Sequence, residues 1–166
     1  MQRVLIIGSN GAGKSTFSYQ LAQRTGLPLI HLDQIYWREC WQVTPRDAFL
    51  RRMEQAAKEE CWIIEGNNVS SLDQRLPYAD TVFWFEFSPL ICILGILKRE
   101  WQYRGKVRPD MPDRCVSRLD FSFLRYAWLF NRRNRTRIRG LLAKYPHLHI
   151  IRFTNRRHVR QYLDAI

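Results

Sequence analysis

The sequence has neither the closely spaced cysteines of a metal-binding or disulfide-stabilised domain nor an apolar run that could cross a membrane. Its four cysteines lie more than twenty residues apart, without a C-x-x-C pair or zinc-ligand spacing. The longest apolar run beyond the first strand, residues 90–97, is far below the roughly twenty residues of a spanning helix. Met1 leads directly into an apolar strand, without the pattern of a signal peptide. We therefore expect reduced thiols and a soluble, cytoplasmic protein.

Acidic residues are also scarce. The chain has 27 Lys and Arg residues against 15 Asp and Glu residues, a formal net charge of +12. The excess is concentrated between Lys98 and Arg139, where thirteen basic and four acidic side chains occur. Such a field attracts nucleotides, nucleic acids and acidic lipids alike, so it predicts an anionic partner without choosing among them. A length of 166 residues and 46% hydrophobic content predict one globular domain spanning 1–166.

Strand-like and helix-like segments alternate along the chain. Short apolar runs predict strands at 3–7, 29–32, 61–64, 81–87 and 148–153. Helical segments are expected at 14–25, 44–60, 89–104 and 121–144 and around 159–166, with Thr44 as the cap of the second. This alternation predicts an α/β fold with a parallel sheet covered on both faces. The proline- and charge-rich segment 105–118 is a candidate lid.

A phosphate-binding signature lies between the first expected strand and the first expected helix. Residues 8–15, GSNGAGKS, match G-x-x-x-x-G-K-[ST] at every fixed position. Its glycines allow backbone N–H groups to point at phosphate oxygens, and the helix start adds positive potential. Lys14 would reach the outer phosphates, and the Ser15 hydroxyl would bind Mg²⁺. We expect ATP and Mg²⁺ to bind here, through Gly8, Asn10, Gly11, Ala12, Gly13, Lys14, Ser15 and Thr16.

Three carboxylates end expected strands. Glu65 and Glu86 are both candidates for a second magnesium anchor, and Glu65 is favoured because the third strand of P-loop kinases lies beside the first. The alternative for Glu86 is a solvated carboxylate. Asp33 could orient or deprotonate an acceptor hydroxyl, or it could simply cap a helix or turn.

Arginines border the candidate lid. Guanidinium groups stabilise the charge of a transferred phosphoryl group without changing protonation state. We expect Arg99 and Arg104 to act in catalysis and Arg156 to lie near the nucleotide base; an ordinary solvated basic face is the alternative reading. The other candidates are Arg108, Arg132, Arg133 and Arg135.

Tryptophans and other aromatic residues are numerous. Core packing is the preferred interpretation for Trp41, Trp84, Trp101 and Trp128, the last sharing a helix face with Phe121. Tyr36 and Trp37 follow Asp33 and are expected to line an acceptor pocket instead.

The chain resembles the adenylate-kinase-like P-loop proteins often labelled DNA topology modulation proteins. The resemblance rests on H-L-D at 31–33, Y-W at 36–37, Trp41, W-I-I-E-G-N at 62–67 and R-P-D at 108–110. It implies a nucleoside-monophosphate-kinase fold with strand order 2-3-1-4-5, a lid and an ATP-type donor. The usual D-G-N-Y is E-G-N-N here, and the D-G-x-P-R of adenylate kinases, whose arginine grips the acceptor phosphate, is absent.

Two functions follow from these patterns. The first is an ATP- and magnesium-dependent phosphotransferase, a kinase for a nucleoside, nucleotide or other small acceptor. The second is a nucleic-acid-associated NTPase that uses the basic surface, although no helix-turn-helix or RNA-binding signature occurs. A GTPase is disfavoured because no N-K-x-D motif follows the P-loop.

Overall fold

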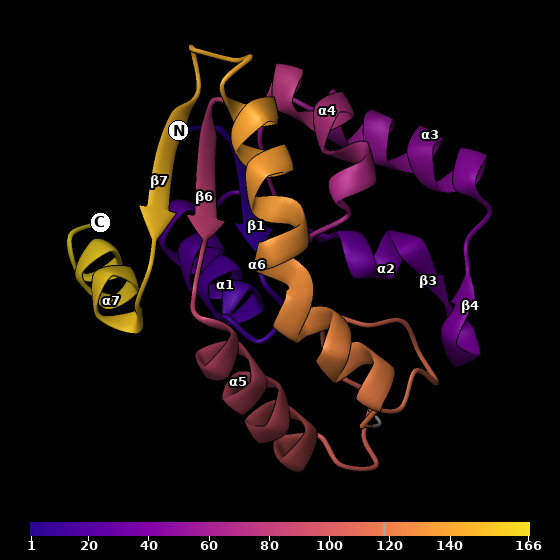
Figure 1. Cartoon of the computed structure of the whole chain (residues 1–166). Helices are drawn as coiled ribbons and strands as arrows, with labels where there is room; N and C mark the ends of the chain where they lie inside the picture. Colours follow the sequence, from indigo (N-terminus) through magenta and orange to yellow (C-terminus); the bar gives the residue numbers. More distant parts are fainter. Residues whose placement is uncertain (118) are drawn as a thin grey trace.

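The computed structural model describes residues 1–117 and 119–166, and Figure 1 shows a central sheet with helices on both faces. The sheet is parallel, with the order β2 (Leu29–His31), β5 (Trp62–Glu65), β1 (Arg3–Gly8), β6 (Thr81–Phe85) and β7 (His149–Phe153). Numbered along the chain, these five strands have the order 2-3-1-4-5. The expected α/β fold and sheet topology are therefore confirmed.

The three central strands, β1, β5 and β6, form because their apolar side chains are buried on both faces of the sheet, whereas the outer strands β2 and β7 are less buried. One face packs against α3 (Arg46–Ala57), α4 (Leu72–Arg75) and α6 (Phe121–Leu142), and the other against α1 (Lys14–Thr25) and α7 (Arg156–Asp164). The central strand β1 lies between β5 and β6. Consequently the carboxyl end of β1 is flanked by the ends of two buried strands, which is where ligands of open α/β sheets bind.

Helix boundaries agree with expectation to within a few residues. The helix α1 ends at Gly26 in the left-handed conformation, and α5 spans Pro89–Gln102 with Ser88 as its cap. The expected cap at Thr44 is wrong: α3 starts at Arg46, no side chain caps it, and the buried Thr44 hydroxyl has no partner among the described residues. Thr44 is instead held by its backbone, which donates to Tyr36 O.

Two regions form elements that the sequence patterns did not predict. A five-residue helix, α2 (Leu32–Tyr36), is followed by a small antiparallel hairpin of β3 (Trp37–Arg38) and β4 (Gln42–Val43), joined by the 3-10 turn η1 (Glu39–Trp41). After β5, two 3-10 turns, η2 (Val69–Ser71) and η3 (Leu76–Tyr78), flank α4. Both regions lie at the carboxyl side of the sheet strands that they follow.

The candidate lid contacts the β3–β4 hairpin. Trp41 Nε1 donates to Val116 O at 3.1 Å, and the Cys115 thiol donates to Arg38 O at 3.2 Å. Cys40 and Trp41 both have positive φ at the hairpin tip, a conformation that costs energy for side-chain-bearing residues. The described part of the segment, residues 105–117, thus contacts the hairpin; Arg118 lies outside the described residues.

The expected core positions of several aromatic residues are wrong. Trp84 is buried, but Trp101 and Phe121 are 81% and 82% exposed and Trp128 is 48% exposed. Helix α6 passes over one face of the sheet, and its first turns extend past the carboxyl ends of the strands (Figure 1). No helix of the described chain is long and apolar enough to span a membrane.

Candidate functional site

The P-loop residues lie between β1 and α1 as a tightly packed turn. Gly8, Gly11 and Gly13 have φ values of 129°, 78° and 93°, which side-chain-bearing residues rarely adopt. A Cβ at Gly8 would lie 2.1 Å from Phe85 O, and one at Gly11 would lie 2.1 Å from a carbonyl of α5. Only glycine therefore fits at these two positions.

The start of α1 offers unpaired backbone donors. Its N-cap is Gly13, and no side chain caps the helix, so the N–H groups of its first turn are available to an anion. Asn10, Ala12 and Thr16 belong to the same turn, and Asn10 faces the adjoining pocket. The eight residues that the sequence predicted for nucleotide binding are thus adjacent in the structure.

Lys14 is buried at the mouth of this turn. Its ammonium donates to Ser9 O at 3.2 Å and lies 3.9 Å from Glu65 Oε1, while the side chain is only 6% exposed. Burial lowers the pKa of Lys14, and the nearby charge of Glu65 opposes this shift. Glu65 neutralises this ammonium only in part, and a polyphosphate bound at the turn would supply the remaining negative charge.

Oxygen ligands suited to Mg²⁺ meet at Ser15. Its hydroxyl lies 3.3 Å from Glu65 Oε2 and 3.2 Å from Asp110 Oδ2. A hydroxyl and two carboxylates form a set of hard oxygen donors of the kind that Mg²⁺ prefers beside phosphate. The residues present therefore fit a magnesium ion, and Asp110 is a candidate ligand that the sequence analysis did not identify.

Glu86 does not belong to this site. Its carboxylate is paired with Arg135, Arg139 and Arg152, and Arg152 Nε lies 2.6 Å from it. Glu86 is only 9% exposed, so the expectation of a solvated carboxylate is wrong. The three arginines neutralise it, and Arg135 is occupied there rather than at the P-loop.

His31 contacts Glu65 from the neighbouring strand. Its Nδ1 lies 3.0 Å from Glu65 Oε2. Burial alone would lower the pKa of His31, but the hydrogen bond and the negative charge of Glu65 raise it above the usual value. His31 thus contacts the same oxygen of Glu65 as the Ser15 hydroxyl.

Asp33 lies in α2 and faces the pocket. The helix has no side-chain cap, so the alternative reading of Asp33 as a cap is wrong. The pKa of Asp33 is raised to about 6, first by desolvation and next by the charge of Glu65, although Lys14 opposes the shift. The side chain keeps some solvent contact because it is at an open pocket wall. A carboxyl group of this kind is poised to take a proton near neutral pH.

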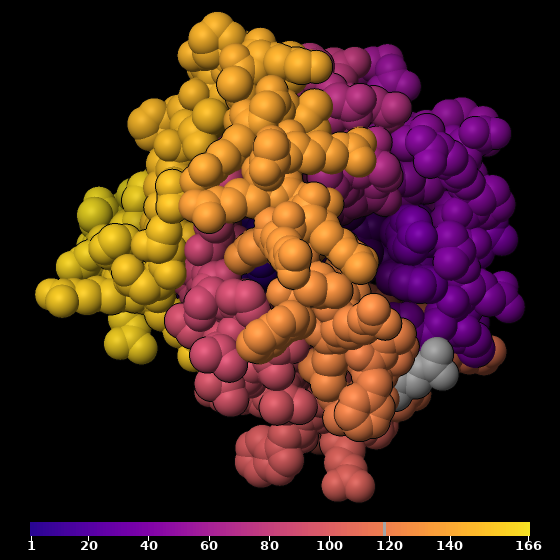
Figure 2. Space-filling view, in the orientation of Figure 1, coloured from indigo at the N-terminus to yellow at the C-terminus, as the bar shows by residue number. Residues whose placement is uncertain are grey.

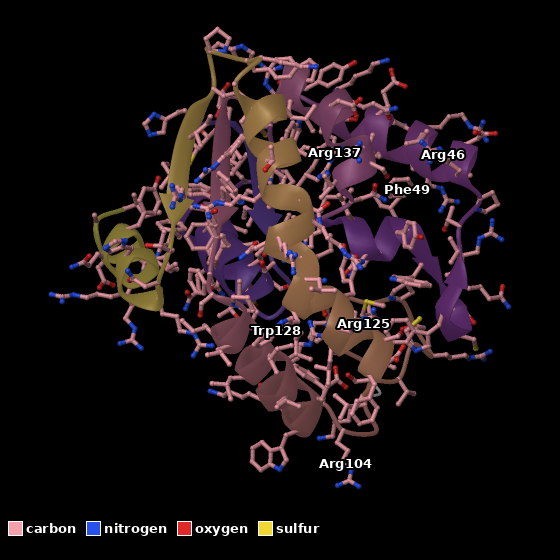
Figure 3. The ribbon with its side chains drawn as sticks, in the orientation of Figure 1. Arg46, Phe49, Arg104, Arg125, Trp128 and Arg137 are labelled. Carbon is pink, nitrogen blue, oxygen red and sulfur yellow. The ribbon has the colours of Figure 1, made fainter. Side chains whose placement is uncertain are left out.

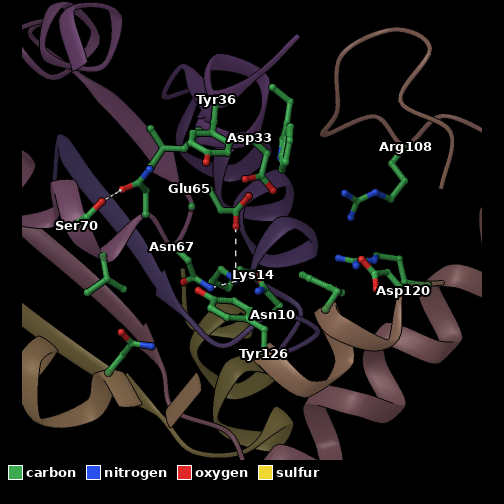
Figure 4. A pocket seen from close by; sticks show the side chains of 18 of the residues that line it. Asn10, Lys14, Asp33, Tyr36, Glu65, Asn67, Ser70, Arg108, Asp120 and Tyr126 are labelled. Carbon is green, nitrogen blue, oxygen red and sulfur yellow. Dashed lines mark hydrogen bonds and ion pairs between the residues drawn. The ribbon is translucent and has the colours of Figure 1, made fainter. Parts of the chain in front are cut away.

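Lys14, Asp33 and Glu65 line one pocket of about 660 Å³, within the usual size of a small-molecule site. Figure 2 shows the surface hollowed between the orange atoms of α6 and the purple atoms around α2. In Figure 4, Asp33 and Glu65 lie on one side, Asn10 and Lys14 at the base, and Arg108 across the opening. Tyr36, Trp37 and Trp41 line the pocket, as the sequence predicted for the first two; the expected core position of Trp41 is wrong.

The arginines divide into two groups. Arg99 and Arg108 line the pocket, and Arg108 Nη1 lies 3.7 Å from Asp110 Oδ2. Burial lowers the pKa of Arg99, and the neighbouring charge of Arg108 lowers it further. Arg104 is exposed beyond α5 and points away from the body of the protein (Figure 3), so the structure does not bring it to the pocket.

The remaining basic candidates lie outside the pocket lining. Arg132 and Arg133 are exposed on α6. Arg156 is exposed at the first position of α7, on the far side of β7 from α6 (Figure 1). By contrast Arg137, which the sequence analysis did not single out, does line the pocket.

Asn67 connects the loop after β5 to the P-loop through two hydrogen bonds, and Arg75 supports the same loop through two more. Asn67 Oδ1 accepts from Gly8 N at 2.9 Å, and its Nδ2 donates to Asn10 Oδ1 at 3.2 Å. The fully buried Arg75 donates to Gly66 O and Asn68 O. The G-N pair of the motif at 62–67 was a signal for Asn67, whereas nothing nearby in the sequence indicated Arg75.

The parallel sheet order and the P-loop between β1 and α1 together define a P-loop NTPase fold of the kinase type. A family model described as Isopentenyl transferase matches residues 1–44, which include the P-loop. Comparison with curated protein sequences gave no match.

Solved structures share the whole fold at low identity. A shikimate kinase from Acinetobacter baumannii in complex with shikimate is similar with a TM-score of 0.61 at 13% identity, covering 99% of this chain and 90% of that one. A shikimate kinase from Bacteroides thetaiotaomicron gives 0.57 at 14% identity, covering 99% and 95%. A sugar kinase from Janibacter gives 0.52 at 14%, covering 99% and 91%. At such identities the likeness establishes the fold alone.

Proposed function

We propose that this protein is a magnesium-dependent phosphotransferase that moves the γ-phosphoryl group of ATP to a hydroxyl group of a small acceptor. The observation that carries this proposal is that Asp33, Lys14 and Glu65 line one pocket, with the Ser15 hydroxyl 3.3 Å from Glu65 Oε2. The isopentenyl transferase match and the kinase neighbours support transfer chemistry on this fold. No comparison supports the nucleic-acid hypothesis, which stays a prediction.

Each group has a task in this proposal. The N–H groups of the P-loop and Lys14 hold the β- and γ-phosphates. Ser15, Glu65 and Asp110 would hold Mg²⁺, which neutralises charge on the β- and γ-phosphate oxygens when bound. Arg99 and Arg108 face the same space and stabilise the charge on the transferred group. We also propose that residues 105–117 act as a lid that brings Arg108 and Asp110 to the phosphates.

The transfer itself balances without a further reactant. The acceptor hydroxyl oxygen forms a bond to the γ-phosphorus, and the bond from the γ-phosphorus to the bridging oxygen breaks. The electron pair of that bond leaves with ADP. The hydroxyl proton passes to the Asp33 carboxylate, whose pKa of about 6 leaves most of it ionised at neutral pH.

The test is ATP binding and phosphoryl transfer by the wild type and by Lys14→Ala. The wild type should bind Mg²⁺–ATP in the micromolar to millimolar range of kinases, and Lys14→Ala should lose at least about tenfold in affinity because the buried cation is removed. Lys58→Ala, an exposed lysine at the end of α3 paired with Glu54, is the matched control. Unchanged binding by Lys14→Ala would contradict the proposal.

A further inference from the structure

The part of the pocket beyond Asp33 is a slot with aromatic walls. Tyr36 and Trp37 form one wall, from α2 and β3, and Phe123 and Tyr126 form the other, from α6. In Figure 4, Tyr36 and Tyr126 lie on opposite sides of the pocket, with Glu65 and Asn67 between them in the view. Aromatic residues therefore reach this part of the pocket from two separate elements.

Core residues hold both walls in place. The Tyr36 ring contacts the buried Phe49 edge to face at a centroid distance of 5.5 Å, and it contacts Trp37 at 5.0 Å. On the other wall, Tyr126 contacts the buried Phe130 at 5.9 Å. Because each tyrosine is braced by a core phenylalanine, the slot is ordered before a ligand enters, which reduces the entropic cost of binding.

The wall of the slot formed by α2 and the loop after β5 does not suit an anionic acceptor. Pocket residues between Leu32 and Ser70 include the carboxylates Asp33 and Glu65 and no basic side chain. A carboxylate or monophosphate on the acceptor would require guanidinium groups beside it. Arg99 and Arg108 lie at the lid side, where the phosphates of the donor are expected, and Arg137 lines the pocket from α6, three residues after Asn134.

Neutral hydrogen-bonding groups are present in the same slot. Asn68 Oδ1 accepts from Ser70 Oγ, and Asn134 Nδ2 donates to Phe130 O. Among the described residues, the Nδ2 of Asn68 and the Oδ1 of Asn134 make no further hydrogen bond. One amide donor and one amide acceptor can thus bind the polar edge of a neutral ring.

We infer that the acceptor is an uncharged nucleoside, whose base lies between Tyr36 and Tyr126 and whose sugar hydroxyl faces Asp33. This inference rests on the proposed function, because it assigns the compound that receives the phosphoryl group. Every nucleobase has a flat π-face and can stack on an aromatic ring, whichever base it is. An alicyclic acid such as shikimate has neither a flat ring nor a partner for its carboxylate on the Asp33 side of the slot.

The experiment combines binding with transfer. Tryptophan fluorescence, to which Trp37 and Trp41 contribute from the pocket, is titrated with nucleosides, their 5′-monophosphates, shikimate and hexoses at saturating Mg²⁺ and a non-hydrolysable ATP analogue. Transfer from labelled ATP is then measured for the same panel. We expect a nucleoside to bind more tightly than its own monophosphate and to receive the label on a sugar hydroxyl.

Variants of the walls identify the slot. Tyr36→Leu and Tyr126→Leu should each raise the nucleoside KM by about 5- to 100-fold, the effect of losing one stacked face, with ATP affinity unchanged. Tyr36→Phe and Tyr126→Phe keep the ring and should restore most of the affinity. Tyr19→Leu, at an exposed tyrosine of α1 outside the pocket, is the matched control and should behave as the wild type.

Three outcomes would overturn the inference. They are the absence of nucleoside binding at millimolar concentration, preferred transfer to a monophosphate, a hexose or shikimate, and an unchanged nucleoside KM in both leucine variants. If ATP binds normally, these results remove the acceptor assignment and leave the proposed function intact. Failure of ATP itself to bind would refute the proposed function.

Discussion

Replacing Asp33 with asparagine should slow phosphoryl transfer and also stabilise the folded protein at neutral pH. The pKa of Asp33 is raised from 3.8 to about 6, mainly because the carboxylate is desolvated in the pocket and also because Glu65 repels its charge. The folded state therefore binds this proton more tightly than the unfolded state. The free energy of unfolding consequently falls as pH rises from about 4 to about 6 and stays lowered above that range.

The size of the gain follows from the same shift. Two pKa units correspond to about 3 kcal/mol at 1.36 kcal/mol per unit, which is an upper limit. Because more than a third of Asp33 is exposed, solvent screening reduces this to about 1 kcal/mol. For a domain of this length, that raises Tm by about 2–4 °C.

Thermal denaturation near pH 7 and near pH 4 measures this effect. Asp33→Asn should melt above the wild type near pH 7, and the difference should shrink near pH 4, where Asp33 of the wild type is protonated. Its kcat should fall by about 10²- to 10⁴-fold, the usual effect of losing a general base, while ATP affinity is kept. Asp47→Asn is the control, because Asp47 lies in the first turn of α3 and its loss should slightly destabilise the protein. A lower Tm for Asp33→Asn near pH 7 would refute this reasoning.

Three further predictions concern Gly95, Arg75 and Asp110, with Gly140 as a contrast to Gly95. Gly95→Ala should lower the free energy of unfolding by about 1–3 kcal/mol through overpacking and weaken ATP binding, because the added Cβ would lie 2.0 Å from Gly11 O. Gly140 lies in a helix with open space around it. Gly140→Ala should therefore stabilise the protein by about 0.5–1 kcal/mol. Arg75→Ala should cost about 2–4 kcal/mol in urea denaturation because the buried Gly66 carbonyl and the part-buried Asn68 carbonyl lose their donor, and a loss below about 0.5 kcal/mol would contradict that role. Asp110→Asn should raise the Mg²⁺ concentration needed for half-maximal ATP binding by about 10-fold or more, measured by calorimetry, and an unchanged requirement would remove it from the proposed metal site.

Regular elements could be predicted from the sequence because their causes are local. A continuous apolar run that ends at Gly8, and a helix that stops at Gly26, depend on neighbours within a few residues. The sheet order came from the resemblance to adenylate-kinase-like proteins, and the structure confirms it. The P-loop could be predicted because its residues are consecutive in the chain.

Contacts between distant segments could not be predicted in this way. Asp110 and Ser15 are 95 residues apart in the sequence. They meet because residues 105–117 pack over the P-loop side of the pocket. The errors at Phe121 and Trp128 have a related cause. Helical spacing shows which side chains share a face, but it does not show where along its length a helix leaves the core.

Docking of the lid also provides a native reporter of its position. The sulfur of Cys115 is enclosed where the lid contacts the β3–β4 hairpin, whereas Cys40 at the hairpin tip is exposed. Alkylation of Cys40 should therefore proceed at a similar rate whether the proposed lid is open or closed, and it serves as an internal reference. Alkylation of Cys115 should require residues 105–117 to separate from the hairpin. The ratio of the two labels, read by mass spectrometry, therefore measures how often the proposed lid opens.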